Sequence, residues 1–579
     1  MAFFTSLAAS LGAYLATLGI SSALATVAAN LIVGIGTQLV ASVLFRPKQP
    51  SAPSTKYQAV INQSAAERTR SYGWAKLGGP RAFWDQKDGK LYQIILLSTG
   101  RISSIERIWI GDKKVSLDAA GNVTTEPFVG YVQISTRMGN QDAVAYEAMV
   151  QAWPIKWSAE HRLRGIANAF VRFQSPPLED LQTIFPESYN TSVTIEVKAS
   201  EVYDPRTGLT GWNDNAGLCI GDYLTAADGF QGIDRDDIDW DSVGAFASTC
   251  GQIVDKKDGT TERRYRLWGT YSLEDEGKAV LDRMTKTCDA ELYLTSEGRI
   301  GLRGGTWTPP TVVIDESMIV SYADLVEGAD RMVAFNEVRI TYVDPKQDYQ
   351  TAEPDPWVDD ADQARRGRIV TDFDVDMCPS PSQARRLAKI HYHKQNPKWQ
   401  GSITTNLLGL NAINERTVTV RIPELSIDMP FMVDGWGINI DGGKPVGATF
   451  QIRSLTPTAY AWDPATEEGT APADVEDDDA EEAEAHPDRL PVPVRAGAVS
   501  YNSQGCAIVS FVPPEGRPDL RITGKIRSGG DSDWLSMSRD GYRLISPPLA
   551  GGTSYVILAR WSDAGSAFGP WTDNIPAHT

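Results

Sequence analysis

The stretch Thr191-Ser-Val-Thr-Ile-Glu-Val-Lys198 opens residues 190–305, the part of the chain whose pattern decides the predicted fold. Its apolar residues alternate with polar ones, and a period of two is typical of a β-strand with one buried face. The segment Val202-Tyr-Asp-Pro-Arg-Thr-Gly208 follows it and predicts a turn, because Pro and Gly both favour turns.

Helical patterns and a hairpin complete this stretch. Three segments place their apolar residues on one stripe, at residues 215–225, 239–253 and 272–288. Ser272 precedes Asp275 by three residues, which approximates a capping box at a helix start. Glu291–Leu294 and Arg299–Leu302 flank a Ser-Glu-Gly turn and predict a β-hairpin. Residues 190–305 are therefore predicted to form a small α+β module with no visible catalytic site.

The composition indicates a large, acidic, multidomain protein. A length of 579 residues suggests roughly three to five domains. The net charge is −19, and residues 463–488 hold twelve acidic and no basic residues. Because no basic stripe is present, we expect no sequence-specific nucleic-acid binding. Five scattered Cys residues predict neither a disulfide framework nor a zinc site, which fits assembly in a reducing cytoplasm.

The first 45 residues contain no charged side chain. They lack a basic leading region, which argues against a secretory signal peptide. Residues 23–45 are long enough to span a membrane, yet Gly34 and Gly36 also favour close helix packing. Three interpretations stay open: helices packed inside an assembly, insertion into a host membrane, and an ordinary membrane anchor. In each we expect this apolar surface to be covered, because it would aggregate in water.

Two β-rich regions flank the central stretch. In the first, short strands predict a barrel or sandwich, and the segments are residues 72–80, 91–97, 102–110, 114–117 and 131–135. A helix over residues 141–153 follows them. In the second region we expect strands at residues 336–343, 401–406, 417–422, 431–433 and 449–455. A helix there begins with Ser380 as N-cap and Pro381, and Gln383 is expected to close a capping box.

Several polar pairs and runs suggest catalysis or metal binding, and their spacing argues against both. Glu160 and His161 are adjacent, so on a helix they face different ways. His391 and His393 are two residues apart and point apart on a helix. The acidic run 234–241 lacks the Gly and Glu positions of a calcium loop. Since no nucleophile, zincin or phosphate-loop motif is present, we expect no catalytic residue, metal or cofactor.

The last 90 residues of the sequence, 490–579, predict a β-sandwich. The pattern Leu549-Ala-Gly-Gly-Thr-Ser-Tyr-Val-Ile-Leu-Ala-Arg-Trp561 resembles a fibronectin type III module. Residues 461–489 before it are acidic and rich in Ala, which predicts a flexible linker. Two roles stay open for the module, a spacer or a surface that contacts host saccharide.

The order of these motifs resembles the central tail hub protein of long-tailed bacteriophages and gene transfer agents. The resemblance covers residues 68–457 and is carried by Val202–Gly208, Ala245–Val254, Arg264–Tyr271 and the helix and hairpin of Ser272–Leu302. It implies an α+β, multidomain chain with β-barrel hub domains, an inserted α+β helical module, N-terminal apolar helices and a C-terminal β-sandwich. The expected division is residues 1–50 (apolar helices and linker), 57–189 (β-rich hub domain with helix), 190–305 (α+β hub module), 306–460 (second β-rich hub domain with helix), 461–489 (acidic flexible linker) and 490–579 (fibronectin type III-like sandwich).

The function that the resemblance implies is structural. Such hubs are homotrimers at the distal tip of the tail in the virion, where they close the tail tube and open for DNA ejection during host entry. Expected partners are the distal tail protein, the tape measure protein and tail fibre or tip proteins, with transient contact to the host membrane. Candidate contacts at the trimer axis or with the tape measure are Phe3, Leu11, Leu18, Leu31, Ile35, Leu39 and Leu44.

Two alternatives compete with this structural role. Sixteen Trp residues and abundant carboxylates are compatible with a cell-wall glycan hydrolase, although many β-rich cores also account for the Trp content. The C-terminal sandwich suggests a host-receptor adhesin. Hydrolase carboxylates need a spacing of roughly 5–10 Å in three dimensions, which sequence patterns do not give.

Overall fold

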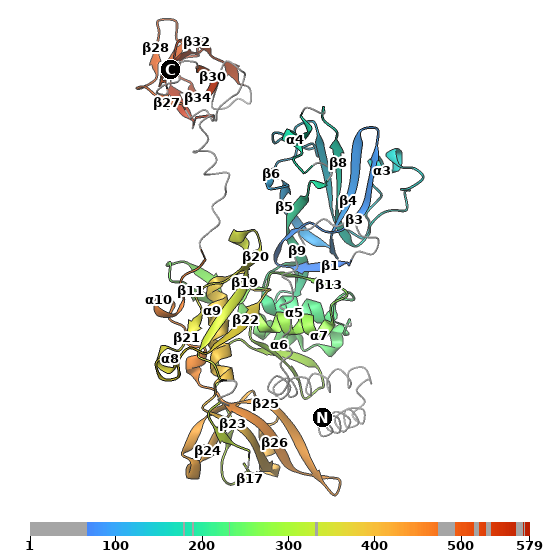
Figure 1. Cartoon of the computed structure of the whole chain (residues 1–579), viewed down its shortest axis with the longest axis vertical. Helices are drawn as coiled ribbons and strands as arrows, with labels where there is room; N and C mark the ends of the chain where they lie inside the picture. The colour runs from blue at the N-terminus through green and yellow to red at the C-terminus, as the bar shows by residue number, and fades with distance from the viewer. Residues whose placement is uncertain are drawn as a thin grey trace. The chain divides into compact units, whose positions relative to one another are not determined.

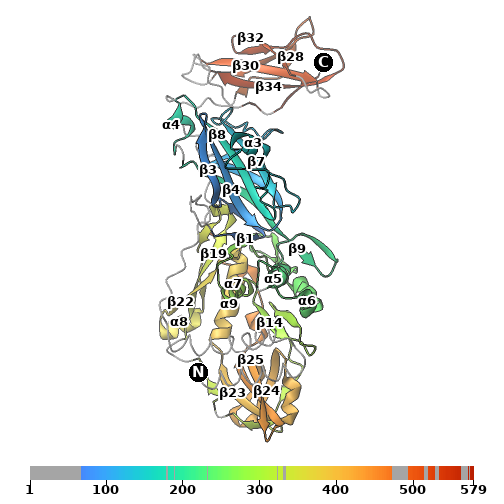
Figure 2. The ribbon, with the colours of Figure 1, turned by 90° about the vertical axis from the view of Figure 1, so that its right-hand side faces the viewer.

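The computed structural model has a multidomain α+β fold, as the sequence predicts (Figures 1 and 2). It describes residues 67–177, 180–187, 190–230, 232–322, 324–329, 334–472, 493–513, 520–528, 534–562, 571–572 and 574–578. The chain divides into two compact units, Met1–Asp474 and Val475–Thr579. The seven candidate contacts from Phe3 to Leu44 lie outside the described residues.

The first β-rich region wraps two sheets around one core. One sheet has the order β3-β4-β8-β7, with the bounds Arg81–Lys87, Lys90–Thr99, Ile166–Gln174 and Val132–Met138. The other has the order β10-β9-β5-β6, with the bounds Leu209–Trp212, Val193–Asp204, Ile102–Ile110 and Lys113–Val115. At one edge, β2 (Trp74–Leu77) pairs with β9 and leads within three residues into β3 of the other sheet. At the other edge, a bridge between Asn122 and Gln133 links the segment after β6 to β7. The two sheets thus join at both edges, as in a barrel.

The strand predicted at residues 191–198 is the first part of β9, at the centre of this first barrel. The outer face of the other sheet is covered by α3 (Glu147–Ala152) and Trp157, which pack on Tyr92 and Phe170. α3 is shorter than the helix predicted over residues 141–153, and the residues before it form turns. A short helix, α4 (Leu181–Ile184), follows β8.

The α+β core combines helices with three strand pairs. Its helices are α5 (Ala216–Thr225), α6 (Trp240–Cys250) and α7 (Gly277–Lys286), with the 3-10 turn η2 (Arg235–Asp237). Its pairs are β1 (Thr69–Tyr72) with β13 (Gly269–Ser272), β11 (Ile253–Asp255) with β12 (Thr261–Arg263), and β14 (Ala290–Leu294) with β15 (Ile300–Gly304). The last pair is the predicted hairpin, with Leu292 opposite Leu302. α7 begins at Gly277, five residues after the predicted cap at Ser272, because Ser272 and Asp275 instead form a turn.

A second sheet extends the same core. It consists of β19 (Glu337–Asp344), β20 (Gln350–Ala352), β21 (Trp357–Val358) and β22 (Val370–Val375), with η3 (Pro345–Gln347), α8 (Asp360–Arg366) and α9 (Pro381–Gln395). Ser380 caps α9 by accepting a hydrogen bond from the Gln383 backbone N–H, as predicted. The Gln383 side chain does not close a capping box: it bonds the backbone of Arg266 and Thr287, and so attaches α9 to the other helices.

The second barrel is one sheet with the order β16-β24-β25-β26-β23-β17. The bounds are Val313–Ile314, Thr417–Ile422, Ile427–Asp441, Lys444–Ser454, Trp399–Asn406 and Ile319–Ser321, and β18 (Val326–Glu327) also pairs with β23. Its edge strands β16 and β17 are separated by only four residues in sequence, so the sheet curls until its edges approach. The sequence predicts only residues 431–433 of β25, since Pro430, Gly435 and Gly437 interrupt its pattern. Short turns complete the region: η4 (Leu407–Ala412), η5 (Pro423–Leu425), η6 (Pro457–Ala459) and α10 (Pro464–Glu467).

The C-terminal unit is a β-sandwich, as predicted. One sheet contains β27 (Val494–Arg495), β28 (Ser500–Tyr501), β29 (Ala507–Val512), β33 (Arg543–Ile545) and β32 (Ser538–Asp540). The other has the order β31-β30-β34-β35, with the bounds Leu535–Ser536, Arg521–Ser528, Ser554–Ser562 and Ile575–His578. The two sheets share a core in which Ile522, Leu544 and Trp561 are buried.

Candidate functional site

The β25–β26 hairpin extends past the neighbouring strands of the second barrel (Figure 1). It carries an apolar stripe. Trp436 lies opposite the buried Phe450, and Ile438 lies opposite the buried Ala448. Side chains alternate along β25, so Ile440 lies on the same side of this strand as Ile438, and a shift in register places it opposite Pro445. The exposed fraction rises from 36% at Ile438 to 65% at Ile440. The stripe therefore leaves the barrel core while keeping its apolar character.

Two leucines and a valine close to this hairpin in the sheet are also exposed. Asn406 of β23 pairs with Gly447 of β26, so Leu407 and Leu408 directly follow the strand that borders the hairpin. Both leucines are half-exposed, as is Val446. We call Leu407, Leu408, Ile438, Ile440 and Val446 the hairpin patch. Burial of one such side chain is worth about 1.5–3 kcal/mol, and contiguous exposed apolar surfaces mark interaction sites.

A buried ion network attaches this barrel to the α+β core. Asp289, between α7 and β14, accepts hydrogen bonds from Lys394 of α9 and, at 2.9 Å, from the Tyr460 hydroxyl. The Arg416 Nη2 lies 3.3 Å from Asp289, and its Nε lies 3.3 Å from Glu291. Burial alone would raise the pKa of Asp289, but the charges of Lys394 and Arg416 outweigh it and lower that pKa. The Arg416 side chain is only 4% exposed, so this network is shielded from solvent.

Further hydrogen bonds brace the same junction. Arg453 of β26 pairs with Asp434 at 2.7 Å and donates to the Lys394 carbonyl at 2.8 Å. Arg416 also donates to the Thr306 carbonyl at 2.7 Å. α9 therefore contacts both the core and the base of the long hairpin strands.

The chain after residue 460 is held on α9, which corrects part of the expected flexible linker. Lys389 donates to the Ala461 carbonyl and pairs with the Glu467 carboxylate. Arg385 donates to the Glu467 carbonyl at 2.7 Å. These cations are buried, so they need the acceptors that this segment supplies. Up to Ala471 and Pro472, the described residues therefore belong to the folded unit.

Strand β1, which pairs with β13 of the core and leads into β2 of the first barrel, is held by a different set of groups. Arg70 of β1 pairs with Asp222 of α5 at 2.6 Å and with Asp228, while the Tyr72 hydroxyl donates to Asp222. Burial raises the pKa of Asp222, although Arg70 opposes this. A row of rings, Trp212, Trp74, Trp268 and Tyr349, continues the contact with centroid separations of 6.2, 6.2 and 6.4 Å.

The His and acidic pairs singled out from sequence have local partners. Glu160 pairs with Arg162, and the His161 ring stacks on Trp157 at 4.8 Å. His391 lies between Phe335 and Phe373, and burial followed by the charge of Lys286 lowers its pKa to about 3. Within the described ranges, no group of three or more His, Cys, Asp or Glu is arranged to hold a metal ion. No helix in those ranges is long and apolar enough to cross a membrane.

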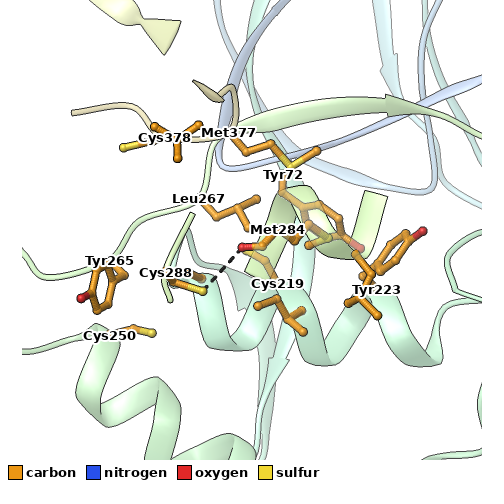
Figure 3. Packing of buried hydrophobic residues seen from close by; sticks show 14 of the residues in the cluster. Tyr72, Cys219, Tyr223, Cys250, Tyr265, Leu267, Met284, Cys288, Met377 and Cys378 are labelled. Atoms are coloured by element: carbon orange, nitrogen blue, oxygen red, sulfur yellow. Dashed lines mark hydrogen bonds between the residues drawn. The ribbon is translucent and has the colours of Figure 1, made fainter. Parts of the chain in front are cut away.

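Four of the five cysteines share the α+β core (Figure 3). Cys219, Cys250, Cys288 and Cys378 are free and buried near Met284 and other apolar side chains. Burial raises the pKa of the Cys250 and Cys378 thiols to about 12, so both stay protonated at neutral pH. All four pack as small apolar residues.

Comparisons with known proteins relate the chain to phage tail proteins. Residues 277–395 match a family model described as putative phage tail protein. A chain from the virion of a native gene transfer agent particle has a similar fold, with 14% identity, a TM-score of 0.50, and coverage of 70% of this chain and 88% of that chain. No curated protein sequence matches.

Two other solved structures align with lower scores. A prophage tail protein from Shewanella oneidensis aligns at 11% identity and a TM-score of 0.26, covering 68% of this chain and 99% of its own. A human fibronectin type III domain aligns at 14% identity and a TM-score of 0.14, covering 16% of this chain and 82% of its own.

Sequence reasoning missed the hairpin patch, although a signal was present. In Trp436-Gly-Ile-Asn-Ile-Asp441, apolar residues alternate with small or polar ones before a Gly-Gly pair, which is a hairpin pattern. The junction residues gave no local signal, because Asp289, Lys394, Arg416 and Tyr460 are far apart in sequence.

Proposed function

We propose that this chain is a structural virion protein, the trimeric central hub that closes the distal end of a phage tail tube. The carrying observation is architectural: one chain has two β-barrels on a shared α+β core, and its fold is similar over 70% of its length to a gene transfer agent virion chain. Three copies supply six barrels, which suits the hexameric symmetry of a tail tube. A closed ring also satisfies every interface between copies.

The hairpin patch supports a role in assembly. It places Ile438 and Ile440 on an arm beyond the barrel core, where a neighbouring copy or tail protein covers them. The proposed neighbours are the distal tail protein, the tape measure protein and tail fibre or tip proteins. Residues 1–45, with Phe3, Leu11, Leu18, Leu31, Ile35, Leu39 and Leu44, are proposed to lie near the trimer axis, contacting the tape measure until the hub opens for DNA.

The oligomeric state of the full chain tests this proposal. Native mass spectrometry from a nonionic detergent should show a trimer. The double variant Ile438→Asp/Ile440→Asp should weaken the trimer at least about tenfold, because about 1.4 kcal/mol corresponds to a factor of ten and two apolar contacts are lost. Ile253→Asp is the matched control, since Ile253 is 64% exposed on β11, outside the patch.

Three outcomes would count against the hub or against the part of the hairpin patch in it. A wild-type monomer at micromolar concentration would contradict the trimer, and equal weakening by Ile253→Asp would remove the hairpin patch from its interface. A monomer that releases soluble fragments from peptidoglycan would replace the hub by the glycan hydrolase.

A further inference from the structure

The C-terminal unit carries cations and tryptophans on the outer face of one sheet. In β30, Ile522 and Ile526 point into the sandwich core, so Lys525 and Arg527 point outward. The Lys525 Nζ lies 4.7 Å from the Trp534 ring centroid and 4.4 Å from that of Trp571. One ammonium group therefore contacts two indole rings.

Two arginines extend this arrangement at both ends. The Arg527 Cζ lies 4.7 Å from the Trp534 centroid, and the Arg560 Cζ of β34 lies 4.4 Å from the Trp571 centroid. The order Arg527–Trp534–Lys525–Trp571–Arg560 forms what we call the cationic row. Cation–π contacts at these distances are attractive, so the row restricts side chains that would otherwise be mobile.

The charge of this face differs from that of the whole protein. Residues 490–579 contain eight Lys and Arg against seven Asp and Glu, whereas the full chain has a net charge of −19. Four of the eight cations, the row's three and Arg521, lie on the β30–β34 sheet. Within the described part of the unit, neither Lys525 nor Arg527 forms an ion pair with a carboxylate. The row is therefore a cationic surface on an acidic protein.

We propose that the cationic row binds an anionic polysaccharide of the host cell surface through carboxylate or phosphate groups. Alternate residues of a strand are about 6.7 Å apart, so Lys525 and Arg527 present charges at a regular spacing that suits a repeating polyanion. The guanidinium groups offer paired donors to either anion, and the indole edges offer apolar contact to sugar rings. The acidic remainder of the chain repels a polyanion, which directs it to this face.

The choice of a host polysaccharide rests on the proposed virion function, whereas the binding chemistry of the row does not depend on the hub, because the sandwich is a separate compact unit. It assigns to this unit the role of a first, salt-sensitive contact with the cell envelope. Carboxylate and phosphate sources share the same recognition chemistry, and the probes below separate them.

The test uses the full chain and three immobilised glucans of equal length: carboxymethyl dextran, phosphorylated dextran and unmodified dextran. Wild type should bind at least one modified dextran, more weakly as salt rises, and should not bind the unmodified one. Lys525→Gln/Arg527→Gln should lose at least about tenfold in affinity. The matched control Arg539→Gln/Arg543→Gln removes two exposed charges from β32 and β33 on the opposite sheet and should stay within about twofold.

The conservative swap Lys525→Arg/Arg527→Lys keeps both charges and should retain binding even if the Gln pair unfolds the sandwich. Loss of binding in a folded swap would overturn the proposal, since the row would then serve the fold alone. Equal loss in the control pair, tighter binding to single-stranded DNA than to either modified dextran, or no binding to the modified dextrans would overturn it as well.

Discussion

The two barrels of the first unit differ in how much of their apolar surface their own chain covers. The first barrel has a covered outer face, where α3 and Trp157 pack on Tyr92 and Phe170. The second barrel continues its core row along the β25–β26 hairpin until Ile440 is mostly exposed. The first barrel therefore has the outer face of one sheet covered by its own chain, while the second leaves the apolar row of its hairpin exposed.

The two barrels also differ in how far the ion pairs that join them to the core are shielded from solvent. The first barrel is joined to the core by a row of aromatic rings and by ion pairs that include Lys76–Asp348, in which the Asp348 side chain is 55% exposed. The second is joined by the shielded network around Asp289 and Arg416. A buried ion pair is costly to break, because the remaining partner is left unpaired and desolvated, whereas an exposed pair contributes little.

The largest effect is expected from Asp289→Asn. Asp289 has a left-handed backbone with φ 53°, which Asn also tolerates, so the change removes the charge and leaves the local geometry. Lys394 and Arg416 then lose a shared buried counter-charge, and we expect a loss of about 3 kcal/mol. Denaturant unfolding followed by Trp fluorescence measures it.

The matched control is Asp348→Asn at the first junction. Asp348 also has a left-handed backbone and pairs with a lysine, Lys76, but its side chain is half-exposed. We expect a loss below about 1 kcal/mol. Equal losses at the two sites would show that both junctions respond alike, contrary to the comparison.

Arg70→Met should have an intermediate effect. It leaves the Asp222 and Asp228 carboxylates without their shared cation, and we expect a loss of about 2 kcal/mol near neutral pH. Burial already raises the pKa of Asp222, and without Arg70 that pKa rises further. A protein whose buried carboxyl has a raised pKa in the folded state regains stability as pH falls through that pKa. The difference in unfolding free energy between the variant and wild type should therefore shrink from pH 7 to pH 5. A deficit that is constant or grows on acidification would contradict this account.

Local patterns in the sequence predicted several elements of the core. The hairpin at residues 290–304 and the start of α9 at Ser380–Pro381 follow from turn chemistry and capping, which act between near neighbours. Gln383 shows the limit of such reasoning. Its spacing fits a capping box, but bonds to Arg266 and Thr287, more than 90 residues away in sequence, take its side chain instead.

Long-range contacts account for what the sequence did not predict. The ion network joins Asp289, Arg416 and Tyr460, whose spacing in sequence carries no signal. The sequence predicts only three residues of the long strand β25, because Pro and Gly weaken the strand pattern there. In the structure, β25 pairs with β26 over nearly the whole length of β25. The acidic composition after residue 460 predicted a flexible linker, but Lys389 and Arg385 of α9 bind its first part.

The smallest effect at neutral pH is expected from His391→Phe, on the helix that anchors the second barrel. His391 lies between Phe335 and Phe373, and its pKa is lowered to about 3, by burial and then by Lys286. The unfolded chain takes up a proton near pH 6.5 and the folded chain does so only near pH 3, so wild type loses stability as pH falls between these values. His391→Phe keeps an aromatic ring there and removes this term, which makes its stability curve flatter by at most about 1.4 kcal/mol per pH unit. Denaturant unfolding from pH 6.5 to pH 4 measures the difference, with the surface variant His161→Gln expected to follow wild type. Parallel curves for wild type and His391→Phe would remove His391 as a source of acid sensitivity at the second junction.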